Sequence, residues 1–128
     1  MNREIKFRAW HKEKNIMFNN FAITATGKLL MTTRKRFSEY PGYDNDSCIL
    51  MQFTGLKDKN GTPIFESDVV EVLFNEGTYL KANPVIWSNN NCIFAVENGE
   101  MHESLSGIVN IEVIGNIFEN PELVQKSS

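Results

Sequence analysis

The sequence predicts a mainly β protein built around a small antiparallel barrel or roll. Three observations support this fold class. Five short apolar runs follow one another within about seventy residues after Ile49. Turn-forming residues separate these runs, and no long stretch shows a helical period. At 128 residues, with 41% hydrophobic and 23% charged side chains, the chain is large enough for one core of reasonable size.

The first predicted strand covers residues 3–10, "REIKFRAW", where apolar and basic side chains alternate. Successive strand residues point to opposite faces. One face would therefore carry Ile5, Phe7 and Ala9, and a cationic outer face would carry Lys6, Arg8 and Trp10. Two more strands are expected in the apolar runs 16–23 and 27–37.

The stretch 38–47, "SEYPGYDNDS", is rich in turn formers and marks a boundary. We expect a basic β-rich segment at 1–48, a barrel at 49–120, and a helical turn with a tail at 121–128. The three parts are expected to pack into one compact domain overall.

Five strands are expected in the barrel, at residues 49–55, 68–74, 83–87, 92–96 and 108–118. Gly115 interrupts the last run and predicts a bulge or a sharp bend. Asn120 followed by Pro121 predicts the start of a short helical turn, as N-cap and first helical residue.

The most tightly specified stretch is "FTGLKDKNGTPIFESDVVEV", residues 53–72. Asp58 can accept hydrogen bonds from backbone N–H groups two or three residues on, and Gly61 can adopt a positive φ. Together they predict a tight turn. Pro63 lacks an N–H, which places it beside the sheet and not in its middle.

Two carboxylates, Glu66 and Asp68, flank Ser67 just before a strand. They could form a general acid and base or bind Mg²⁺, but no third group supports such chemistry. The favoured interpretation is structural: Asp68 caps the turn backbone and Glu66 faces water. An enzyme would gain support if the fold brought His102 beside Glu66 or Asp68 in a cleft.

Charge is distributed unevenly although the net charge is only −3. Residues 1–36 hold nine basic and two acidic side chains, whereas 37–128 hold four basic and fourteen acidic ones. Basic residues interleaved with aromatics are typical of surfaces that bind single-stranded nucleic acid. The candidate contacts are Lys6, Arg8, Trp10, Arg34, Lys35 and Arg36. Alternatively, the charges compensate one another within the fold, or between subunits of an oligomer.

Cysteine and histidine give no sign of a metal site. Cys48 and Cys92 each lie in an apolar run and are expected to be small buried hydrophobes. His11 and His102 have no ligand at close spacing. No cofactor is expected. The basic, polar start lacks the apolar run of a signal peptide and nothing spans a membrane, so a cytoplasmic protein is expected.

Three stretches, "REIKFRAW", "LMQFTGLKDKNGTPIFESDVV" and "EVIGNIFENPEL", occur in this order and spacing. Together they resemble the YopX family of phage and prophage proteins. The resemblance implies an SH3-like barrel in the C-terminal part, a bacterial host cell, and a biochemical role that is not established. It brings no catalytic residues. The family commonly has Glu-Gly-Asp where this chain has Ser67 between the acids.

These observations favour a phage or prophage accessory protein without catalytic activity. It would act as a protein-interaction or self-assembly module, with a second copy or a host or phage protein as partner. The alternative is a nucleic-acid-binding accessory protein that uses the basic N-terminal face. The two differ in a measurable way, because binding to nucleic acid falls steeply with salt.

Overall fold

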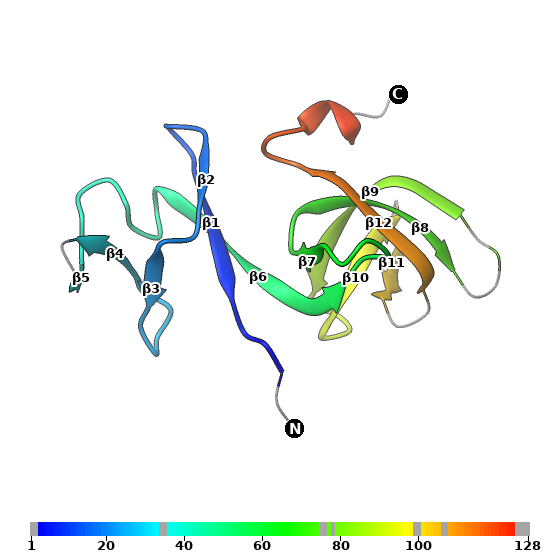
Figure 1. Cartoon of the computed structure of the whole chain (residues 1–128), viewed down its shortest axis with the longest axis horizontal. Coiled ribbons are helices and arrows are strands. Elements are labelled where there is room, and N and C mark those ends of the chain that lie inside the picture. The colour runs from blue at the N-terminus through cyan, green and yellow to red at the C-terminus, as the bar shows by residue number, and fades with distance from the viewer. Residues whose placement is uncertain are drawn as a thin grey trace. The chain divides into compact units, whose positions relative to one another are not determined.

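The computed structural model describes residues 3–33, 36–74, 77, 79–98, 101–105 and 108–124. The chain divides into two compact units, one formed by Lys6–Met51 and the other by Gln52–Ser128 together with Met1–Ile5. Wherever the described ranges give a residue-to-residue register between two strands, the pairing is antiparallel, and a 3-10 turn follows the last strand (Figure 1). The mainly antiparallel β architecture is therefore confirmed, while the SH3-like barrel stays a prediction.

The unit Lys6–Met51 contains five short strands and the beginning of a sixth. They are β1 (Phe7–His11), β2 (Ile16–Phe18), β3 (Phe21–Ile23), β4 (Leu29–Thr33), β5 (Arg36–Ser38) and the first part of β6 (Cys48–Lys57). β1 pairs with β2 and neighbours β6, and β3, β4 and β5 form a separate sheet in that order.

This unit has its own core, centred on the buried Ala9, Leu29 and Cys48. Partly buried hydrophobic side chains pack against it: Phe18, Phe21, Met31, Tyr43 and Leu50. Burial raises the pKa of the Cys48 thiol above its ordinary value, which keeps it protonated and unreactive.

Cys92 does not follow the prediction of a buried hydrophobe, because it is exposed. It ends the turn after strand β9 (Tyr79–Ser88) with φ of +54°, and its N–H donates to the Ser88 carbonyl at 2.7 Å. That turn points its side chains to solvent, so an apolar neighbourhood in sequence did not produce burial.

The unit with Gln52–Ser128 contains the rest of β6 and six further strands. They are β7 (Pro63–Phe65), β8 (Asp68–Phe74), β9 (Tyr79–Ser88), β10 (Ile93–Asn98), β11 (Met101–Ser104) and β12 (Ile108–Asn116), followed by the 3-10 turn η2 (Pro121–Leu123). Five strands form one sheet in the order β11-β10-β9-β8-β12. Its core consists of Ile64, Val70, Val72, Val85, Val96 and Leu105.

The observed elements differ from the predicted ones in several places, and β7 is a strand that the predicted set does not include. The runs 16–23 and 27–37, each predicted as one strand, are both split in two, giving β2 with β3 and β4 with β5. β11 forms from a polar stretch that belongs to none of the predicted strands, and it pairs with β10 from Ala95 to Asn98.

The end of β12 carries the predicted bulge. The register with β8 shifts between Val113 and Gly115. Pro121 opens η2 as expected, but the side chain of Asn120 does not cap this turn. Its Oδ1 instead accepts a hydrogen bond from the Asn116 N–H at 3.2 Å. Within the ranges given above, no helix is both long and apolar enough to cross a membrane.

Candidate binding site

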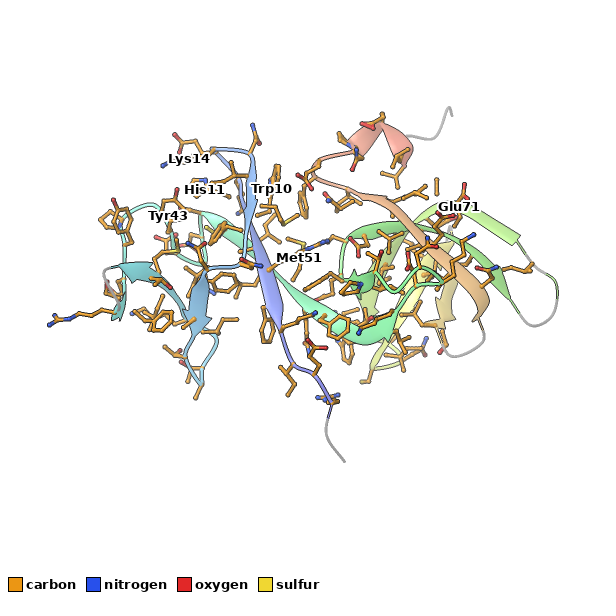
Figure 2. All side chains as sticks on the ribbon, in the orientation of Figure 1. Trp10, His11, Lys14, Tyr43, Met51 and Glu71 are labelled. Carbon is orange, nitrogen blue, oxygen red and sulfur yellow. The ribbon has the colours of Figure 1, made fainter. Side chains whose placement is uncertain are left out.

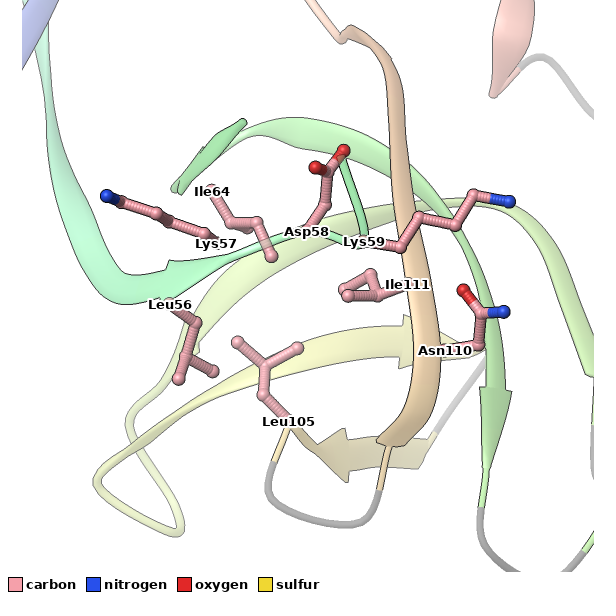
Figure 3. A pocket seen from close by; sticks show the side chains of 8 residues that line it. All are labelled: Leu56, Lys57, Asp58, Lys59, Ile64, Leu105, Asn110 and Ile111. Atoms are coloured by element: carbon pink, nitrogen blue, oxygen red, sulfur yellow. The ribbon is translucent and has the colours of Figure 1, made fainter. Parts of the chain in front are cut away.

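A hollow of about 390 Å³ opens on the unit with Gln52–Ser128. It is lined by the end of β6, the turn after it, β7, the residue after β11, and β12 (Figure 3). The lining residues are Leu56, Lys57, Asp58, Lys59, Ile64, Leu105, Asn110 and Ile111. A volume of this size lies in the range of ligand-binding pockets, about 300 to 1,000 Å³.

A bulge in β6 places Leu56 at this hollow. Phe53 pairs with Phe65 and Lys57 with Pro63, so β6 takes four steps where β7 takes two. Gly55 has φ of +91°, which only glycine adopts at little cost.

Thr54 holds the two strands together at this bulge. Its hydroxyl donates to the Ile64 carbonyl at 2.8 Å and accepts from the Leu56 N–H at 3.2 Å. Leu56 is consequently fixed in position while 46% of it stays exposed.

Asp58 is a structural carboxylate, although it lines the hollow. Its Oδ1 accepts the N–H groups of Asn60 and Thr62 at 2.8 and 2.9 Å, and its Oδ2 accepts the Val113 N–H at 3.0 Å. Gly61, at φ of +84°, closes the same turn by donating to the Asp58 carbonyl at 3.0 Å.

These hydrogen bonds determine the protonation of Asp58. Desolvation acts to raise the pKa of its carboxyl group. The N–H donations from Val113, Thr62 and Asn60 outweigh it, and the pKa is lowered.

Lysines stand on both sides of the apolar lining. In Figure 3 the side chains of Lys57 and Lys59 extend in opposite directions, with Ile64 and Ile111 between them and Leu56 and Leu105 below. Lys59 Nζ lies 3.4 Å from Glu112 Oε1, and both side chains are partly exposed. Such an exposed pair stabilises a fold by about 0 to 1 kcal/mol at most.

A smaller hollow of about 180 Å³ shares Lys59 and Asn110 with the first one. It is also lined by Glu71, labelled in Figure 2, and by Glu112. Glu71 and Glu112 are direct cross-strand partners on β8 and β12. Two like charges in such positions destabilise a sheet, and Lys59 offsets part of that cost.

The acidic pair Glu66 and Asp68 has structural roles. Asp68 is buried, and its Oδ2 accepts the Phe65 N–H at 2.8 Å. Glu66 does not simply face water, as predicted, because its Oε1 accepts the Gln52 N–H at 2.7 Å. Ser67 between them has φ of +72°, so serine occupies the left-handed conformation that glycine prefers.

The predicted nucleic-acid contacts are not equally available. Lys6 and Arg8 are half-buried and Arg36 is exposed, whereas Arg34 and Lys35 lie outside the described residues. Trp10 is only 7% exposed, so the prediction of an exposed ring on the outer face is wrong. Ala9, Trp10 and His11 are buried in succession, which means that both faces of β1 are covered there.

Both ring nitrogens of His11 have partners within its own unit. Its Nε2 lies 2.8 Å from the Gly42 carbonyl oxygen, and its Nδ1 accepts the Lys14 N–H at 3.1 Å. Figure 2 shows it beside Tyr43, whose ring centroid is 4.6 Å away, and Lys14 Nζ lies 5.0 Å from that same centroid. The side chain of His102 lies outside the described residues. Where side chains are described, no three His, Cys, Asp or Glu residues gather as metal ligands would.

Comparisons with known proteins place these features in context. The family model described as YopX protein matches residues 6–125. The crystal structure of protein EF1440 from Enterococcus faecalis is similar with a TM-score of 0.65 and 25% identity, over 97% of this chain and 100% of that one. The crystal structure of protein yopX from Bacillus subtilis is similar with a TM-score of 0.62 and 21% identity, over 93% and 97%. No curated protein sequence matches this chain significantly.

Proposed function

This chain belongs to the YopX protein family, and we propose that it is a non-catalytic interaction module which binds a partner polypeptide at the hollow beside Leu56. The observation that carries the proposal is an exposed leucine held by a bulge at the mouth of an aliphatic hollow. Apolar surface left in water is unfavourable by about 25 cal/mol per Å². Covering Leu56 and the side chains beside it would therefore favour association.

The chemistry of the lining supports binding more than catalysis. A general acid or base must exchange its proton with a ligand. Asp58 is the carboxylate in this lining, and three backbone N–H groups already occupy its two oxygens. Its negative charge stabilises the turn by accepting these three hydrogen bonds.

The expected setting is the cytosol of a bacterial host, where the protein would act as a phage or prophage accessory factor. The two structural relatives come from bacteria, which is consistent with this setting. The partner would be a second copy of the chain or a host or phage protein.

Site-specific photo-crosslinking in the bacterial host tests the interaction module. A photoreactive amino acid replaces Leu56 in one variant and Ile16 in a control variant. The two positions are matched, because Leu56 is 46% and Ile16 43% exposed, and they belong to different units. We expect a discrete polypeptide adduct from position 56 and none of the same mass from position 16.

The substitution Leu56→Ser then distinguishes a functional contact from an accidental one. It should abolish copurification of the crosslinked polypeptide and leave the folded chain intact, because an exposed leucine contributes little to the core. Equal adducts from both positions, or none from position 56, would contradict the proposal.

The alternative function, nucleic-acid binding, draws support from the charge of one unit. Lys6–Met51 contains eight basic and four acidic side chains, and Arg36 is exposed. Titration with random single- and double-stranded oligonucleotides at two salt concentrations tests it. Binding with a log–log salt slope of about −0.7 to −0.9 per phosphate, weakened by Arg36→Glu, would favour nucleic acid over protein as the partner.

A further inference from the structure

We propose that the occupant of the hollow is an extended polypeptide segment with the pattern acidic–x–apolar–x–acidic. This inference rests on the proposed function and goes further, because it specifies the chemistry of the partner. It is derived from the arrangement of one apolar region and two lysines on β6, β12 and the turn between β6 and β7.

The apolar position follows from the lining of the hollow. Leu56, Ile64, Leu105 and Ile111 gather in its centre (Figure 3). A volume of about 390 Å³ accepts one large aliphatic or aromatic side chain. Buried apolar anchors of this kind dominate the energy of protein interfaces.

The acidic positions follow from charge complementarity at the mouth. Lys57 and Lys59 extend on opposite sides of the apolar centre. The carboxylate between them belongs to Asp58, whose oxygens are engaged by backbone N–H groups and do not pair with either lysine. A partner with carboxylates on both sides of its apolar side chain would match these two ammonium groups.

The spacing follows from strand geometry. In an extended segment, residues two apart point to the same side and lie about 6.6 to 6.8 Å apart along the chain. An acidic residue two positions before the apolar one and another two positions after it would therefore face the same surface as the anchor.

The two lysines are not equivalent. Lys59 already pairs with Glu112, which lines the smaller hollow together with Glu71. Lys57 has no hydrogen bond or ion pair to any side chain that the structure describes. We expect Lys57 to contribute more to selection of an acidic partner, so Lys57→Glu is the informative substitution.

Three synthetic peptides with blocked ends test the pattern: Gly-Asp-Ser-Phe-Ser-Asp-Gly, Gly-Lys-Ser-Phe-Ser-Lys-Gly and Gly-Asp-Ser-Ser-Ser-Asp-Gly. Each is titrated into the full chain at low salt, and amide chemical shifts around residues 56–59 and 110–111 are followed by NMR. We expect the acidic Phe peptide to bind about tenfold more tightly than the basic one. Lys57→Glu should remove or reverse this preference, while Lys12→Glu, an exposed lysine of the other unit, should preserve it.

The outcomes separate this inference from the proposed function. If both Phe peptides bind equally, or the basic one binds better, the acidic pattern is overturned and the hollow remains a binding site. If neither Phe peptide shifts these amides, both proposals fail at this surface. If dilution of the chain alone produces the same shifts, the occupant is a second copy and the acidic pattern is again overturned.

Discussion

Ser67 has a backbone conformation that is unfavourable for a residue with a Cβ. A left-handed φ costs a residue with a Cβ about 1–2 kcal/mol, and glycine largely avoids this cost. Ser67 has φ of +72° and therefore carries this conformational cost. Its N–H donates to the Val85 carbonyl, and its carbonyl accepts from the Ile117 N–H. These two backbone bonds hold the turn in place and explain why the conformation persists without glycine.

Ser67→Gly should therefore stabilise the protein by about 0.5–1 kcal/mol. Urea denaturation measures this change as a shift of the midpoint at unchanged slope. Ser67→Ala is the matched control, because it removes the hydroxyl and keeps the Cβ. Equal stabilisation by both substitutions would show that the hydroxyl, and not the backbone, is responsible.

Asp58 makes the stability of the protein depend on pH in a defined direction. Its pKa is lowered in the folded state, so it contributes stability above the unfolded value of about 3.9. That contribution is lost as the pH falls through the lower folded pKa.

Asp58→Asn should lower the free energy of unfolding at neutral pH by about 1–3 kcal/mol. The amide has one acceptor atom where the carboxylate has two, so at least one of three N–H groups loses its partner. Below about pH 4 the variant should also lose less stability than the parent chain. If the free energy of unfolding fell equally with pH in both proteins, Asp58 would not be the source of this pH dependence.

At the level of the element, the missing side chain of Gly115 leaves room for Asn120 and Leu123 to pack against the end of β12. A Cβ at this position would lie 2.6 Å from Asn120 Oδ1 and 2.8 Å from Leu123 Cδ1. The need for glycine here is steric and comes from residues five to eight positions later in the chain.

Gly115→Ala should destabilise the protein by about 1–3 kcal/mol, the usual cost of overpacking. Combining it with Leu123→Ala removes one of the two clashing groups. The double variant should therefore lose less stability than the sum of the two single variants, as measured by a thermal denaturation cycle. Strict additivity would mean that Leu123 moves away without cost.

The elements show which sequence signals suffice. β8 and β12 were predictable because their apolar residues stand between clear turn formers, and the bulge was predictable from Gly115. The split at residues 19–20 was not, because two asparagines inside an apolar run are a weak break. β11 was missed because polar strand residues have no period-2 pattern to detect.

Of the candidate site, only the turn between β6 and β7 could be predicted from the sequence. Asp58 and Gly61 follow from local turn chemistry. Exposure of Leu56 depends on the register between β6 and β7, which local sequence does not determine, although glycine within an apolar run is a recognised signal of a bulge. Burial of Trp10 depends on what covers both faces of β1, and alternation alone wrongly assigned one face to solvent.

At the level of the whole molecule, the buried side chains that the structure describes form two hydrophobic clusters with no residue in common. One contains Leu29 and belongs to Lys6–Met51, and the other contains Ile64 and belongs to Gln52–Ser128. Leu29 and Ile64 are both fully buried aliphatic side chains. They offer a matched pair of core substitutions.

Leu29→Ala and Ile64→Ala should each cost about 2–5 kcal/mol within their own cluster. Native-state hydrogen exchange should show faster exchange in β1 and β4 for the first variant and in β8 to β10 for the second. Equal acceleration throughout the chain in both variants would show that the two units unfold as one cooperative body.

The hydrogen bonds around Asp58 have a consequence for the behaviour of the protein at high concentration. Val113 N–H and the Ile111 carbonyl point away from β8, where another chain could pair with them, but Asp58 Oδ2 and the Lys59 N–H occupy both. An unprotected edge of this kind is a template for fibril growth. One turn therefore protects the edge of β12 against intermolecular β-pairing, and we expect its loss to make the protein prone to aggregation.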